Sequence, residues 1–107
     1  MNKPLTQARV IRTLRKQMPR LRAEYGVEKI ALYGSFAKGT ANRRSDVDIL
    51  VHLTRPLGLE FVQLAFDLEK SLGRKVDLAT FDTFQRGLAQ PRYARIPSNV
   101  ERTLRYV

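Results

Sequence analysis

The feature that most constrains this chain is an aliphatic run interrupted by acids, Ser45-Asp46-Val47-Asp48-Ile49-Leu50-Val51. Branched aliphatic residues favour β-strands, in which residues i and i+2 point to the same face. We therefore expect Asp46 and Asp48 to project together, about 6.5–7 Å apart, while the aliphatic residues between them face the core. Two carboxylates side by side and partly out of water are costly unless a cation neutralises them. The run predicts a strand with a functional acid pair; the alternative is a solvated strand edge.

A third acid lies in a similar setting, between aliphatic residues in Lys75-Val76-Asp77-Leu78-Ala79. If this strand neighbours the first, the three carboxylates converge on one edge of the sheet. That is a ligand set for two divalent metal ions about 3.5–4 Å apart, which clamp the attacking and leaving oxygens of a phosphoryl or nucleotidyl transfer. With no cysteine and one histidine in the chain, oxygen ligands point to magnesium or manganese. The alternative is that Asp77 is a strand-end aspartate bonded to a turn.

A Gly-Ser pair, Gly34-Ser35, lies upstream of the acids at an expected strand end. Glycine permits close approach of the backbone, and the following amides together with the Ser35 hydroxyl would form an anion cradle. Lys38 adds a cation one turn later, and Gly39 lets the chain turn away. The pair predicts a phosphate site, and its alternative is an ordinary strand-to-helix turn with a serine cap.

Hydrophobic periodicity predicts an α/β pattern in which helices cover a small sheet, in a single domain over residues 1–107. Pro19 predicts a kink or break in the first helix near Gln17–Met18. The aromatic residues expected in the core are Tyr33, Phe36, Phe61, Phe66 and Phe81, and Phe36 alternatively flanks the nucleotide. The expected elements are helices over 5–24 and 59–72, strands over 28–33, 47–53 and 75–80, a short helix from Ser35, and short helices marked by Phe84, Leu88, Ile96, Val100 and Leu104.

The composition indicates a folded, basic and non-membrane protein. Apolar residues make up 43% of the chain, and no run approaches the ~18 apolar residues of a membrane span, so we expect a cytoplasmic location. The formal net charge is +10, with seven bases in residues 3–22 and five arginines in residues 86–105. This charge favours a polyanion such as RNA or an acidic protein partner, or it is a solvated surface. Arg43 and Arg44 are a further candidate for steering a triphosphate, and His52 is expected to be a plain strand-end histidine.

At these motifs the sequence resembles the minimal nucleotidyltransferase branch of the DNA polymerase β-like nucleotidyltransferase superfamily. The family pattern is Gly-Ser, ten residues, then Asp-x-Asp; here Gly34-Ser35 is followed by ten residues and Asp46-Val47-Asp48. The likeness extends to the flanking segments 32–39 and 76–78 and to Ser45 before the first acid. The likeness covers roughly residues 27–80. It implies an α/β (α+β) fold, a small mixed β-sheet with flanking helices, which is the polymerase β-like nucleotidyltransferase core.

The resemblance implies a role for each matching residue. Gly34, Ser35, Lys38, Gly39 and Ser45 would bind the nucleotide, ATP being the donor. Asp46, Asp48 and Asp77 would hold two Mg²⁺ ions, and Asp77 would be the general base for the acceptor hydroxyl. Lys38 departs from the family, which most often has arginine there, and so loses the bidentate fork.

Minimal members of this family resemble antitoxins encoded beside a HEPN-domain RNase toxin, in type VII-like pairs in which AMP from ATP is attached to a toxin tyrosine. The resemblance therefore implies a HEPN-toxin partner and an AMP-transferring antitoxin. Two alternatives are a non-catalytic antitoxin that acts by complex formation and a small-molecule nucleotidyltransferase. The latter is disfavoured because the chain has no second domain to shape a small-molecule pocket. Direct RNA binding through the basic flanks is a further alternative.

Overall fold

The computed structural model describes residues 5–42, 45–83 and 104–107. Within them, the four-stranded sheet has the order β3-β2-β1-β4. It is mixed as predicted, because β2 runs parallel to β3 while β1 runs antiparallel to β2 and β4. In chain order the elements are α1 (Gln7–Tyr25), β1 (Val27–Tyr33), α2 (Gly34–Lys38), β2 (Val47–Leu53), α3 (Leu59–Leu72), β3 (Val76–Thr80) and β4 (Arg105–Tyr106).

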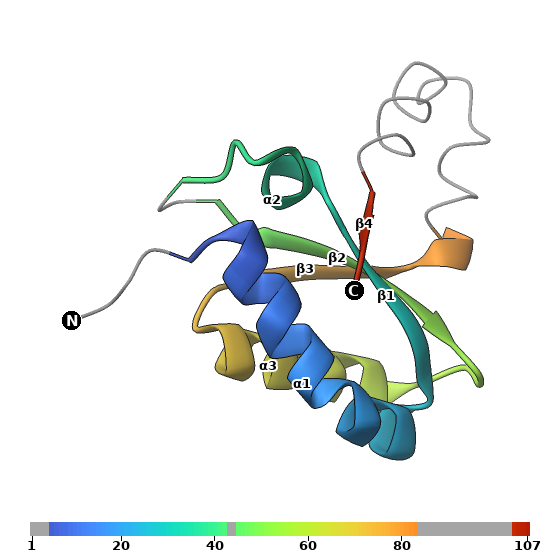
Figure 1. The fold of residues 1–107 in the computed structure, drawn as a ribbon. Helices are drawn as coiled ribbons and strands as arrows, with labels where there is room; N and C mark the ends of the chain where they lie inside the picture. Colours follow the sequence, from blue (N-terminus) through green and yellow to red (C-terminus); the bar gives the residue numbers. More distant parts are fainter. Residues whose placement is uncertain (1–4, 43–44, 84–103) are drawn as a thin grey trace, which may run out of the picture.

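Two helices cover one face of the sheet. Figure 1 shows α1 and α3 side by side on that face, with α2 at the end of β1. Alternate residues of β2 point into this layer, because Val47, Ile49 and Val51 have no exposed surface. The same core holds Val10, Leu14 and Leu21 of α1, Ile30 and Leu32 of β1, and Leu64 and Leu68 of α3. Asp48 alternates with these three residues, so it projects from the face opposite α1 and α3, which it shares with the buried Leu50.

The first helix begins and ends with local signals. The Thr6 hydroxyl accepts a hydrogen bond from the Arg9 amide, and Gly26 ends the helix with a positive φ of 70°. A break near Gln17–Met18 is contradicted, because α1 continues through Pro19, while a kink there stays a prediction. Proline costs the helix one hydrogen bond but fits helical φ, and the buried Leu14 and Leu21 hold the turns on either side of it.

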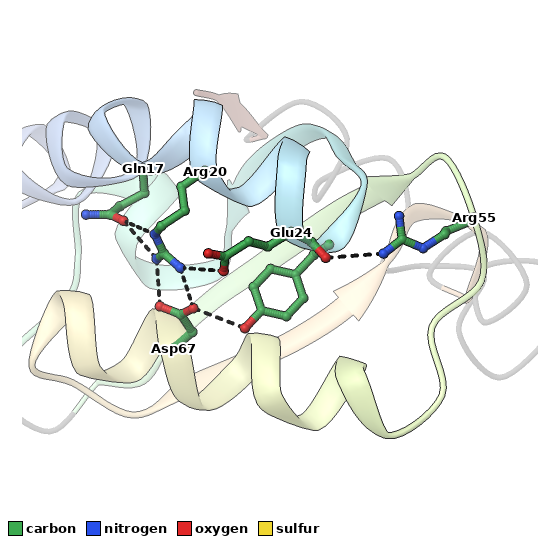
Figure 2. Close-up of polar contacts among 6 residues, drawn as sticks. Gln17, Arg20, Glu24, Arg55 and Asp67 are labelled. Carbon is green, nitrogen blue, oxygen red and sulfur yellow. Dashed lines mark hydrogen bonds and ion pairs between the residues drawn. The ribbon is translucent and has the colours of Figure 1, made fainter.

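A polar clamp joins α1 to α3, as Figure 2 shows. The two Nη atoms of Arg20 each donate a 2.7 Å hydrogen bond to the Asp67 carboxylate, and the Tyr25 hydroxyl donates a third at 3.1 Å. Gln17 Oε1 accepts from the same guanidinium at 2.8 and 3.0 Å. The hydrogen bond from Arg20 lowers the pKa of Asp67 below its ordinary value. A bidentate pair of this kind fixes the relative orientation of the two helices.

The chain end departs from the prediction. Leu104 was expected in a short helix, but it directly precedes strand β4, in which Tyr106 pairs with Ala31 and Arg105 with Leu32. The Val107 amide also donates to the Ile30 carbonyl at 2.9 Å. The open edge of β1 supplies these partners, and edge pairing over two residues leaves no periodicity in the sequence. The other expected helical positions, Phe84, Leu88, Ile96 and Val100, lie outside the described residues.

The aromatic residues divide between core and surface. Phe36 is 1% exposed and lies in the core. This burial argues against the alternative that Phe36 flanks a nucleotide. Phe66 was expected in the core, but it is 64% exposed. The reason is helical geometry: Leu64 and Leu68 carry the buried stripe of α3, and position 66 projects about 200° away from each of them. Tyr33, Phe61 and Phe81 are partly buried.

Candidate active site

Two of the three predicted acids lie side by side. In the parallel pairing of β2 with β3, Asp48 is the register partner of Asp77. Paired residues of neighbouring strands point to the same face, so both carboxylates belong to the sheet face opposite α1 and α3. The condition set for the predicted acid site, that the two acid-bearing strands are neighbours, is met for Asp48 and Asp77. Asp77 is exposed, whereas Asp48 is half-buried.

A tyrosine completes this row across three strands. Tyr33, the last residue of β1, is the register partner of Asp48. Burial, followed by the charges of Asp77 and Asp48, raises the pKa of the Tyr33 phenol to about 12. The phenol therefore stays protonated throughout the physiological pH range. The sequence predicts Tyr33 as a core residue and not as a neighbour of the acids. Its position directly before Gly34 is the sequence signal that places it at the site.

The acids oppose one another electrostatically. The pKa of Asp48 is raised from 3.8 to about 6, first by burial and then by the charges of Asp77 and Asp46. Asp46 lies one residue before β2 and is exposed, yet its charge acts on Asp48. The ionised form of Asp48 is therefore disfavoured until positive charge arrives. Negative charge gathered in this way attracts a cation.

The predicted phosphate cradle lies directly against Asp48. Gly34 has a φ of +69°, and a Cβ at this position would collide with the Asp48 carboxylate. The position thus requires glycine for two reasons, its backbone conformation and the close approach of the acid. Ser35 follows in α2, and Gly39 ends that helix by donating its amide to the Ser35 carbonyl. The Gly-Ser turn and the acid row consequently form one site.

The remaining predicted nucleotide contacts are arranged less directly. Lys38 is exposed on the last turn of α2. Ser45 closes a small turn, because its hydroxyl accepts a 2.9 Å hydrogen bond from the Asn42 amide. Its part in nucleotide binding remains a prediction, as do the roles of Arg43 and Arg44, which lie outside the described residues.

Sequence reasoning missed one residue that shapes the site. Arg74 Nη1 donates to the carbonyls of Asn42 and Ser45, at 3.1 and 3.0 Å. Its guanidinium also lies 5.9 Å from the centre of the Phe36 ring. Arg74 thereby joins the loop before β2 to the turn before β3. No motif or periodicity marks it, since a single arginine after Gly73 resembles any helix-ending cation.

The acids fit a divalent cation in their chemistry. Hard cations prefer carboxylate oxygen, and the mutual repulsion of Asp48 and Asp77 is the kind that a bound cation relieves. The three predicted ligands are not gathered at one point, however. Across residues 5–42, 45–83 and 104–107, no group of three histidine, cysteine or acidic side chains could hold a metal ion. Binding of a cation by all three acids would require their side chains to turn toward it.

Residues 11–106 match the family described as the nucleotidyltransferase domain. This chain belongs to that family.

In the described part of the chain, no helix has the length and apolar character needed to cross a bilayer.

The chain is similar to curated relatives that are named as protein adenylyltransferases. It is 41% identical over 71 residues to the protein adenylyltransferase MntA of Thermococcus cleftensis, an alignment covering 65% of this chain and 72% of the relative. It is also 41% identical over 78 residues to a candidate protein adenylyltransferase of Methanocaldococcus jannaschii, with 70% and 78% of the two chains covered.

Two solved structures share the fold. One, described as a minimal nucleotidyltransferase, has a TM-score of 0.65 and 31% identity, with 94% of each chain covered. The other is a toxin–antitoxin crystal structure with AMP-PNP, with a TM-score of 0.52 and 32% identity. The match covers 71% of this chain and 57% of the matched chain in the toxin–antitoxin structure. The present chain therefore spans a little over half the length of that chain.

Proposed function

We propose that this protein is the antitoxin of a HEPN/MNT toxin–antitoxin pair, and that it transfers AMP from ATP to a tyrosine of the partner toxin. The observation that carries the proposal is the Asp48–Asp77 pair lying against the Gly34 turn. Support comes from the relative named protein adenylyltransferase MntA and from the similar toxin–antitoxin structure with AMP-PNP, an ATP analogue. We place the reaction in the cytoplasm, where ATP is available.

The nucleotide binds at the start of α2. The absence of a side chain at Gly34 lets the triphosphate approach the backbone, and the Ser35 hydroxyl donates to a phosphate oxygen. Lys38 and Gly39 lie at the far end of the same short helix, where the Lys38 ammonium balances phosphate charge. Arg74 keeps the loop that carries Ser45 and Asp46 in position through its two carbonyl contacts.

The transfer step exchanges one bond to the α-phosphorus for another. The acceptor phenol oxygen bonds to the α-phosphorus of ATP while the bond from that phosphorus to the bridging oxygen breaks, releasing pyrophosphate. The phenol proton passes to a carboxylate oxygen of Asp77, which is exposed on the open face of the sheet and therefore accessible to an acceptor on another protein. Tyr33, which is partly buried on the other side of Asp48, has a pKa raised to about 12 and keeps its own proton.

Magnesium is the cation that this donor set suits. Asp46, Asp48 and Asp77 would hold it, and when bound it supplies positive charge that offsets the triphosphate and the acids. Asp48 gains most from this, because its carboxylate carries the raised pKa.

The proposal is tested by following the α-phosphate. The protein is incubated with Mg²⁺, ATP labelled at the α-phosphate, and the HEPN protein encoded beside it. We expect label on a tyrosine of that protein, and loss of labelling by at least about a hundredfold in Asp77→Asn, in line with the contribution of a general base. Asp82→Asn is the matched control, because it removes an exposed acid just beyond the same strand.

Two outcomes would contradict the proposal. Labelling that persists in Asp77→Asn would remove the base from the mechanism. A toxin that is neutralised without receiving label would show that the protein acts by complex formation.

A further inference from the structure

The outer face of α1 carries positive charge that the proposed chemistry does not use. The helix contains six cations and one acid, Glu24. Arg20 is occupied by Asp67, but four other cations are exposed and make no ion pair or side-chain hydrogen bond with the described part of the chain. These four, Arg12, Arg15, Lys16 and Arg22, are called the basic stripe below.

The geometry of the helix gathers the basic stripe on one side. At about 100° per residue, Arg12 and Lys16 lie opposite the buried Leu14, and Arg15 and Arg22 lie beside them on the same outer half. From the first to the last of the four, the stripe runs about 15 Å along the helix axis, at about 1.5 Å per residue. Three of its members also line a shallow hollow on the N-terminal half of α1.

The stripe lacks the apolar anchors of a protein interface. In the described segments, the large apolar side chains with high exposure are Leu59, Val62 and Phe66 on α3 and Tyr106 on β4. None of them lies on α1. The centre of a protein–protein interface is normally apolar and poor in charge, whereas nucleic-acid backbones are bound by lysine and arginine at regular intervals. The composition of the stripe therefore favours phosphates over an acidic protein.

The stripe and the acid row lie on opposite sides of the sheet. The inner face of α1 packs on the same layer as Val47, Ile49 and Val51, and Asp48 projects from the other side of that strand. A polyanion on α1 is thus kept away from the acids, which would repel it. Binding on α1 and nucleotidyl transfer can be measured independently.

We propose that the basic stripe of α1 binds the phosphate backbone of single-stranded RNA without reading its sequence. A helix surface is convex and the stripe is short, so a flexible strand can follow it. A duplex, with a persistence length of about 50 nm, would touch it over fewer phosphates. Arginine provides most of the contacts, and its guanidinium fork matches phosphate geometry.

The test measures the salt dependence of RNA binding by the full chain. The probe is a fluorescently labelled RNA of about 20 nucleotides, which is longer than the stripe. Its anisotropy is recorded across KCl concentrations for the wild type and for Arg12→Gln/Arg15→Gln/Lys16→Gln. Three lost contacts at about 0.7 per phosphate should reduce the slope of log K against log [KCl] by about two, and lower the affinity at low salt by about tenfold or more. Glutamine is a good helix former, and far-UV circular dichroism checks that α1 is retained.

The matched control is Lys29→Gln/Lys70→Gln/Lys75→Gln, which removes the same charge at three exposed positions outside α1. We expect its slope to stay close to that of the wild type. An equal loss in the control would show diffuse attraction to net charge and overturn the proposal. Unchanged binding by the α1 variant would do the same. Tighter binding to polyglutamate than to RNA would identify an acidic protein as the occupant instead.

Discussion

Replacing Asp48 by asparagine should make the metal-free protein more stable. The ionised carboxylate is disfavoured by burial and by two neighbouring acids, which raise its pKa to about 6. No hydrogen bond from the described residues supports this carboxylate. Asparagine has nearly the same shape and carries no charge, so the substitution removes an unfavourable interaction without removing a bond. Natural proteins retain such costs at functional positions.

The size of the effect follows from the pKa. A rise from 3.8 to about 6 amounts to about 3 kcal/mol of unfolding free energy at neutral pH, at about 1.36 kcal/mol per pKa unit. Asp48 is only half-buried, and solvent screening reduces this to about 1–2 kcal/mol. The folded state holds the Asp48 proton more tightly than the unfolded state does. The wild type should therefore gain stability as the pH falls from 7 through 6 toward 4.

Urea denaturation in EDTA, at neutral pH and near pH 4, measures both parts of this prediction. At neutral pH the Asp48→Asn variant should unfold with a free energy higher by about 1–2 kcal/mol, and near pH 4 the difference should almost vanish. Added Mg²⁺ should stabilise the wild type more than the variant. A variant that is less stable at neutral pH, or a difference that does not depend on pH, would refute the reasoning.

Three other substitutions or conditions give results of known sign. Gly34→Ala should lower the free energy of unfolding by about 2–3 kcal/mol and abolish transfer, because it combines a strained positive φ with a collision against Asp48. The control is Gly39→Ala, which also has a positive φ but has open space around it. It should cost only about 1 kcal/mol in the same denaturation assay. An equal cost at both glycines would contradict the contact. Asp67→Asn should lower the free energy of unfolding by about 1–3 kcal/mol at neutral pH. The sign is opposite to that of Asp48→Asn, because Arg20 lowers the pKa of Asp67. This contribution should be lost as the pH falls below about 4, and a stabilised variant would be inconsistent with the clamp. At subsaturating Mg²⁺, the rate of transfer should decline as the pH falls through about 6, because Asp48 takes up a proton. Excess Mg²⁺ should move that decline to lower pH. A pH profile that Mg²⁺ does not shift would exclude Asp48 as a ligand.

The predicted elements with strong periodicity agree closely with the structure. Strand β2 over Val47–Leu53 and helix α3 over Leu59–Leu72 have the expected bounds. Alternating burial in a strand and a three- and four-residue stripe in a helix are imposed by local geometry. The sequence predicts a strand around each of Asp48 and Asp77 but leaves open whether the two strands are neighbours, and the structure pairs them in parallel.

Features that depend on distant partners were not predictable. Strand β4 exists because the edge of β1 offers hydrogen-bonding groups to Tyr106 and its neighbours. The continuity of α1 through Pro19 depends on packing against the sheet and on the clamp to Asp67. Arg74 has its place only because the loop before β2 and the turn before β3 meet in space. None of these contacts leaves a local pattern in the chain.

The same distinction applies to the site. The motif predicts that Gly34 and Asp48 belong to one site, and the structure shows the two residues close together, since a Cβ on the glycine would overlap the acid. The raised pKa of Asp48 depends on burial and on charges from two other segments. It is therefore a property of the fold, which the residue type alone cannot give.

The most direct test of the central claim is the intact mass of the HEPN toxin after production in cells together with this protein. With the wild type, we predict that the toxin mass increases by whole AMP units, that the modification maps to tyrosine, and that the ribonuclease activity of the toxin is lost. With Asp48→Asn/Asp77→Asn the toxin should keep its unmodified mass and its activity. A toxin of unmodified mass that is nevertheless silenced by the wild type would contradict the account.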